Sequence, residues 1–120
     1  EFALVAPAFL AMIGLVIEGG RMLWTQQTLD EVAFSTARCA TIDADTCDTT
    51  AKQKQYAIDR AASYALAVTT SDVTITKSTT CNSQSGMNRV EVRHRFDTPF
   101  GPLLSAQSGT LVGVGCFPAL

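Results

Sequence analysis

The chain is 120 residues long, 47% hydrophobic and 17% charged, with a formal net charge of −2. This length suits a single domain, and the nearly neutral charge argues against nucleic acid as a partner, because nucleic-acid-binding domains are usually strongly basic. No nucleotide-binding glycine motif is present, so we expect no cofactor.

The first segment, EFALVAPAFLAMIGLVIEGGR, is uncharged from Phe2 to Ile17. As a helix this run rises about 24 Å, somewhat less than the ~30 Å hydrocarbon core of a bilayer. The residues directly after it, including Arg21 and Trp24, can supply the missing length, since arginine snorkels and tryptophan prefers the interface. A signal peptide would have a basic start and a small-residue cleavage site, and about a hundred further residues could hardly enclose a core helix. We therefore predict a membrane-crossing helix.

Helical periodicity continues after this run. Apolar or small residues recur at three- and four-residue steps and form one stripe: Met22, Leu29, Val32 or Ala33, and Thr36 or Ala37. The polar residues Gln26, Gln27, Asp30 and Glu31 lie off this stripe. The pattern predicts one long helix over residues 1–38, with an apolar half (1–20) and an amphipathic half (21–38).

Residues 39–120 are predicted to form a globular head. Helical spacing of alanines predicts a second helix at about 50–68, with Asp48 or Thr49 as its N-cap. The period then changes to two, which predicts strands at about 72–80, 88–97 and 109–117. We expect loops at CNSQSG and DTPFGPLLSAQSG to join them into a three-stranded antiparallel sheet with one face on the helices. The fold class is therefore α+β.

The four cysteines lie at positions 39, 47, 81 and 116, without the close spacing of a zinc or redox site. An even number of cysteines favours two disulfides in an oxidising compartment. Three pairings are open, and spacing alone does not decide among them. We favour Cys39–Cys47, which closes a short local loop, and Cys81–Cys116, which joins strand ends.

Alternation in NRVEVRHRF places Val90, Val92, His94 and Phe96 on one face of a strand. His94 is therefore expected to be a partly buried, hydrogen-bonded histidine. A basic stripe of Arg89, Arg93 and Arg95 occupies the other face. We expect this stripe to be solvated or to contact another subunit, with Arg93 and Arg95 as the candidate contact residues.

Asp43, Asp45 and Asp48 lie close together in DADTCD, which raises the alternative of calcium binding. The segment lacks the glycine and the distal glutamate of an EF-hand, so a polar turn is the preferred interpretation and no metal site is predicted. The sequence holds one histidine and no Ser-His-acid or paired-carboxylate signature. We predict no catalytic residues and no enzyme.

The N-terminal motifs resemble those of TadE-like proteins, which are minor pilins or pseudopilins of tight-adherence (Tad) pili in the type IV filament superfamily. In order, the matching elements are Glu1-Phe2, Pro7, Glu18-x-Gly20-Arg21, Trp24 and Ala37-Arg38. The tail, VEVRHRFDTPFGPLL followed by a last strand and Pro118, also resembles the family. The resemblance covers about the first forty and the last thirty residues.

The resemblance implies a lollipop-shaped subunit that waits in the inner membrane and is then extracted into an extracellular filament. Its expected partners are identical or related pilin subunits and a prepilin peptidase. Glu1 is expected to set subunit register by pairing with a neighbour's N-terminal amine. The family is cut a few residues before this glutamate, so we expect a short leader remnant to precede it. Small residues including Gly14 allow close helix packing, and Glu18 is expected to pair with Arg21.

Two functions stay open at this point. The chain is either a structural filament subunit whose head serves adhesion, or a membrane-anchored envelope protein whose head binds an assembly or adhesion partner. Pro7 lacks an amide hydrogen and crowds the carbonyl of Ala3. We therefore expect a break or kink over residues 3–7 in the assembled filament, with residues 9–36 one continuous helix.

Overall fold

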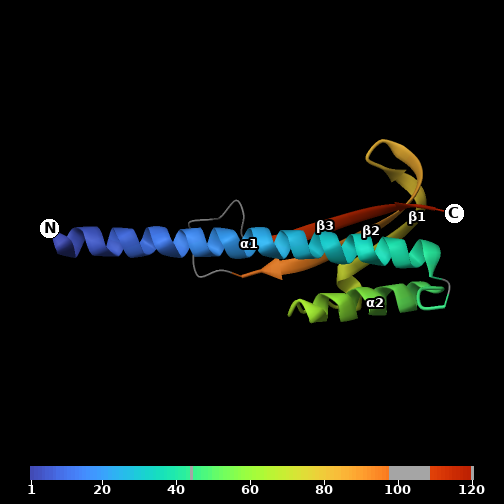
Figure 1. Cartoon of the computed structure of the whole chain (residues 1–120), viewed down its shortest axis with the longest axis horizontal. Helices are drawn as coiled ribbons and strands as arrows, with labels where there is room; N and C mark the ends of the chain where they lie inside the picture. The colour runs from blue at the N-terminus through green and yellow to red at the C-terminus, as the bar shows by residue number, and fades with distance from the viewer. Residues whose placement is uncertain (44, 98–108, 120) are drawn as a thin grey trace.

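The computed structural model describes residues 1–43, 45–97 and 109–119. The elements follow in the order α1 (Phe2–Ile42), α2 (Thr50–Ser63), a 3₁₀ turn (Thr70–Asp72), β1 (Val73–Cys81), β2 (Gln84–Phe96) and β3 (Gly109–Pro118). The strands form an antiparallel sheet in the order β1-β2-β3. One half of α1 lies along the sheet and the other projects beyond it (Figure 1), which gives the molecule a longest dimension of 65 Å. The predicted α+β lollipop is confirmed.

Helix α1 is longer than predicted, running to Ile42 instead of residue 38, and it includes Pro7 without an assigned interruption. Glu1 is its N-cap, and the Glu1 carbonyl accepts from the amides of Leu4 and Val5 at 3.2 Å. In the single chain, residues 9–36 lie within this continuous helix. The break expected over residues 3–7 concerned the assembled filament and stays a prediction.

The second half of α1 packs on the sheet through the predicted stripe. Its buried side chains recur at three- and four-residue steps: Thr25, Thr28, Leu29, Val32, Ala33, Thr36, Ala37 and Cys39. They meet the inner face of the sheet, where Val73, Val90 and Val92 are at most 1% exposed. This is the core of the head, and helix α2 adds Ala57 and Ala61 to it.

The predicted end of the second helix is wrong, because α2 stops at Ser63 and not near residue 68. Its N-cap is Thr49, whose side chain accepts from the Lys52 amide at 3.2 Å. At the other end Ala65 is left-handed (φ 60°), and the amides of Ala65 and Leu66 bond back to Ala62 and Ala61. This Schellman ending buries Leu66 although the helix has finished. Because Leu66 is buried and stands at helical spacing, the sequence pattern predicted a helix that continued past Ser63.

The second strand begins earlier than predicted. β2 starts at Gln84 instead of residue 88, so most of the expected CNSQSG loop is strand. The connection is a tight turn at Asn82 and Ser83, both with positive φ (51° and 67°), which matches the twist of a two-residue hairpin. The outer strands agree with prediction to within one residue at each end.

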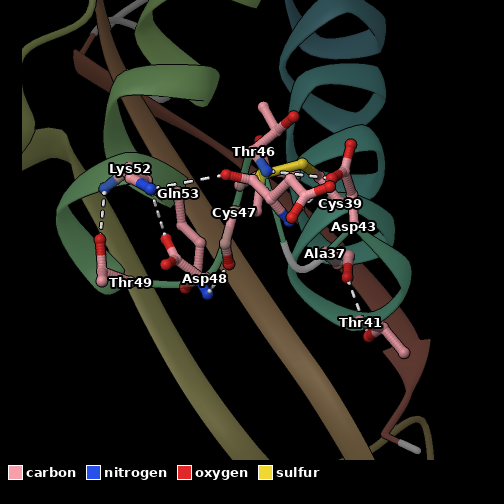
Figure 2. Close-up of a disulfide and its surroundings, with 12 residues drawn as sticks. Ala37, Cys39, Thr41, Asp43, Thr46, Cys47, Asp48, Thr49, Lys52 and Gln53 are labelled. Carbon is pink, nitrogen blue, oxygen red and sulfur yellow. Dashed lines mark hydrogen bonds and ion pairs between the residues drawn. A yellow bond between two sulfur atoms is a disulfide. The ribbon is translucent and has the colours of Figure 1, made fainter.

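Two disulfides fix the ends of these elements, in the pairing favoured from the sequence. Cys39 and Cys47, 5.7 Å apart at Cα, join the end of α1 to the segment before α2 (Figure 2). Next to the first disulfide, the side-chain amide of Gln53 in α2 donates to the Cys47 carbonyl at 2.8 Å. Cys81 and Cys116, 6.4 Å apart at Cα, tie the end of β1 to β3.

Candidate membrane and filament interface

The projecting half of α1 is exposed on all sides. Its large apolar side chains range from 36% exposed at Leu15 to 84% at Phe2. The helix is long and apolar enough to cross a membrane, and only 6% of its most apolar window is buried in the rest of the chain. A soluble core helix would be covered by its own protein. We call residues 2–17 the rod, and within the described chain the head leaves its surface open.

A charged pair marks the end of the rod. Glu18 is only 6% exposed, and its carboxylate accepts from the Arg21 guanidinium at 2.6 Å, which confirms the predicted pair. The guanidinium also lies over the ring of Phe96, 5.4 Å from its centroid. Phe96 is the last residue of β2. The head therefore packs against α1 from about Glu18 onward.

Trp24 follows one turn after Arg21 and is 53% exposed. An arginine and a half-exposed tryptophan at the end of an apolar helix are typical of the boundary between hydrocarbon and water. The geometry thus places a candidate interface where the rod meets the head. Both residues lie where the sequence predicted them, on the helix directly after the apolar run.

This helix is also the part of the chain that is similar to a known family. Residues 1–38 match the TadE-like protein family. The match covers the rod, the Glu18–Arg21 pair and most of the stripe that packs on the sheet. Searches of curated proteins and of solved structures gave no significant match.

The match agrees with the resemblance seen in the sequence, and it shows that the N-terminal helix is similar to that of TadE-like proteins. The TadE-like family is structural and not enzymatic. The motif residues Glu1, Phe2, Pro7 and Gly14 all lie in the rod or at its cap. The matched region ends at residue 38, so the head lies outside it. What the head does has to be argued from its own residues.

The basic stripe lies on the outer face of the sheet, away from α1. Arg93 and Arg95 are exposed, and Arg95 pairs with Asp97 at 3.4 Å. Arg89 pairs with Glu91 on the same face. His94 lies on the inner face, half-buried, with Nδ1 3.2 Å from the Ala67 carbonyl oxygen. It is the hydrogen-bonded histidine that the alternation predicted.

The aspartates of the first loop form a turn. Asp43 accepts from the amides of Asp45 and Thr46 at 3.2 and 3.0 Å, and Asp48 pairs with Lys52 at 2.9 Å (Figure 2). The Thr46 amide holds the pKa of Asp43 below its usual value, and the Lys52 ammonium does the same for the pKa of Asp48. Across the described residues no three metal-binding side chains come together.

The sequence pattern did not predict the close contact between β3 and α1. A Cβ placed on Gly113 would overlap the backbone of Leu29, and one on Gly115 would overlap the backbone at Ala33 and Phe34. These two glycines let α1 lie directly on β3. The signal was present as two glycines at the inward positions of one strand, where a strand usually carries large side chains.

Two polar side chains of α1 complete this contact. The Gln26 amide donates to the Val112 carbonyl at 2.8 Å, and the Val114 amide donates to Asp30 at 3.2 Å. Val112 and Val114 belong to β3, one of the two edge strands of the sheet. Unpaired strand edges invite pairing with other chains. Gln26 and Asp30, which the sequence pattern placed off the apolar stripe, therefore occupy part of this edge.

Proposed function

We propose that this chain is a structural subunit, a pilin or pseudopilin, of a Tad-like type IV filament. The observation that carries the proposal is the rod, which is apolar all round and which the described part of the head leaves open. Such a surface needs apolar neighbours on every side. Lipid supplies them before assembly, and the rods of other subunits supply them in a filament.

The head is then displayed at the filament surface for adhesion. It is held to the second half of α1 by direct backbone contact at the two glycines and by the Cys39–Cys47 disulfide near the end of the helix. The proposed sequence of locations is the inner membrane, followed by the extracellular filament. Processing by a prepilin peptidase and subunit contacts through Arg93 and Arg95 belong to the same proposal.

The alternative is a membrane-anchored envelope protein whose head binds an assembly or adhesion partner. Both functions need an apolar rod, but only a filament needs rods to approach one another closely. Small residues such as Gly14 permit this approach, and lipid does not require them. A substitution that keeps the rod apolar while enlarging residue 14 separates the two functions.

The experiment compares Gly14→Leu with Val16→Leu in cells that express the full chain. Val16 is 70% exposed on the same rod, and its replacement by leucine changes volume little. Membrane fractionation is expected to recover both variants as it does the wild type. Sheared surface fibres labelled with antibody to the head are expected to contain the Val16→Leu chain and to lose the Gly14→Leu chain. Fibres without the wild-type chain would refute the filament proposal and favour the anchored alternative.

A further inference from the structure

A groove runs between the two helices of the head, which lie side by side (Figure 1). It follows α1 from Glu31 to Asp43, and Tyr56 and Arg60 of α2 form its other wall. Its volume is about 330 Å³, which is at the lower end of the roughly 300–1,000 Å³ of pockets that hold small molecules. The groove is therefore large enough for one small ligand.

The side chains of the two helices point into this groove together. On α1 the residues that line it include four at steps of three or four, which lie on one face of a helix: Glu31, Ser35, Arg38 and Ile42. Across the groove the Arg60 guanidinium lies 3.4 Å from the Glu31 carboxylate. The Ser35 hydroxyl donates to the same carboxylate at 2.9 Å. The polar groups of the groove are thus held close to one another.

One positive charge in the groove has no counter-charge within the described residues. Arg38 is exposed and makes no ion pair or hydrogen bond in this part of the chain. Arg60 is paired with Glu31, and Asp43 accepts from amides of its own loop (Figure 2). The groove therefore suits a ligand with a single negative charge. A carboxylate matches the guanidinium fork, whereas the two carboxylates nearby repel a doubly charged phosphate.

The remaining surfaces of the groove suit hydroxyl and C–H groups. Both donors to Glu31 meet the same oxygen, Oε1, so the other oxygen keeps lone pairs for a ligand. Because Arg60 already offsets the charge of Glu31, a neutral hydroxyl is a better donor there than a second cation. Ile42 is 53% exposed and Tyr56 is half-buried. Aromatic and aliphatic side chains of this kind provide the apolar wall of a small-molecule pocket.

We propose that the groove binds an acidic sugar, a monosaccharide unit with one carboxylate, of a surface polysaccharide. Arg38 contacts the carboxylate, Glu31 accepts from a ring hydroxyl, and the Tyr56 ring packs against C–H groups of the sugar. This inference rests on adhesion as the proposed role of the head. A filament repeats the groove in every subunit, so weak single sites combine into strong attachment.

The methyl groups of Ile42 give a local signal, because Ile42 lines the groove. The full chain, isotope-labelled at its isoleucine methyl groups and held in non-ionic detergent micelles, is titrated with D-glucuronic acid and with N-acetylneuraminic acid. D-glucose lacks the carboxylate, and acetate lacks the hydroxyls. We expect a saturable shift of the Ile42 resonance with at least one acidic sugar and weaker responses to glucose and acetate. Ile75, which packs against the core, is expected not to shift.

Arg38→Gln is expected to weaken the apparent affinity about tenfold, the order expected for a hydrogen bond to a charged group. Arg38→Lys keeps the charge without the planar fork and is expected to lose less. Lys77→Gln is the matched control, since it removes one positive charge from an exposed side chain of β1 that does not line the groove. Because Arg38 is exposed and unpaired within the described chain, its variants are expected to fold.

Several results would overturn the proposal. These are no saturable Ile42 shift with either acidic sugar, an equal response to glucose or acetate, and equal losses in Arg38→Gln and Lys77→Gln. A glutamate tripeptide that binds more tightly than both sugars would instead indicate a protein partner. The sheared-fibre experiment separates this proposal from the filament. A chain that is present in fibres but binds neither sugar would overturn the groove proposal alone, and a chain that binds sugar but is absent from fibres would overturn the filament alone.

Discussion

Replacing Gly113 by alanine tests whether the helix backbone lies directly on the sheet. The added Cβ would be 2.6 Å from the Leu29 Cβ and would also overlap the Leu29 carbonyl group. Ordinary carbon–carbon contact is about 3.5–4.0 Å, so α1 and β3 would have to separate by roughly 1 Å. Leu29 is fully buried, and neither it nor its backbone can rotate away.

The expected cost follows from this geometry. Adding a methyl group to a well-packed core usually costs about 1–3 kcal/mol, and a backbone obstacle places Gly113→Ala in the upper part of that range. For a domain of about this size each kcal/mol lowers the melting temperature by ~4–8 °C, so a loss of roughly 10–20 °C is expected. Separation of α1 from β3 would also weaken the bonds of Gln26 and Asp30 to the strand edge.

Scanning calorimetry of the full chain in detergent micelles measures the unfolding of the head, since a micelle can keep the rod helical. Gly20→Ala is the control, because a Cβ at Gly20 meets nothing within 4 Å. In an exposed helix that change is expected to be neutral or to stabilise by up to about 1 kcal/mol. A Gly113→Ala head that melts at the wild-type temperature would refute the direct helix–strand contact.

Three further predictions concern the head and the rod. Replacing Cys81 and Cys116 together by serine is expected to lower the stability of the head by about 2–4 kcal/mol, measured by calorimetry against the oxidised wild type; an unchanged melting temperature would contradict the pairing. Asp43 and Asp48 have pKa values below the usual 3.8 in the folded chain, so the stability that they add is present above that value and is lost as pH falls through their folded pKa values. As the pH is lowered through the acid range, the melting temperature of Asp43→Asn is therefore expected to fall less steeply than that of the wild type. Equal slopes in the two proteins would argue against a contribution of the Asp43 carboxylate to stability. Pro7→Ala is expected to straighten the rod and change subunit packing in a filament map while the melting temperature of the head stays the same; a wild-type map with a straight, fully bonded helix through Leu10 would rule out the kink.

Much of this fold follows from periodicities that are local in the sequence. The long helix, the three strands and the inward face of β2 all carry patterns that do not depend on distant residues. The apolar surface of the rod was predictable for a simpler reason. A helix built from a run without charged residues or a polar face is apolar on every side. The Glu18–Arg21 pair needed only the geometry of one helix.

What could not be predicted depends on contacts between distant segments. The end of α2 is set by a left-handed Ala65 and by burial of Leu66, and local spacing gives no warning of either. Gly113 and Gly115 have meaning only once α1 is known to lie on β3. The contact of the Arg21 guanidinium with the Phe96 ring likewise joins residues that lie far apart in the chain and meet only when β2 ends beside α1.

One helix can serve two environments because the head holds only its second half. From about Glu18 onward α1 is fixed by the sheet, the two glycine contacts and a disulfide near its end, while the described part of the head leaves the preceding rod open. The same continuous helix crosses this boundary, so a force on the head passes into the rod without a hinge. In the proposed assembly the rod exchanges lipid for neighbouring rods, and neither exchange requires the head to refold.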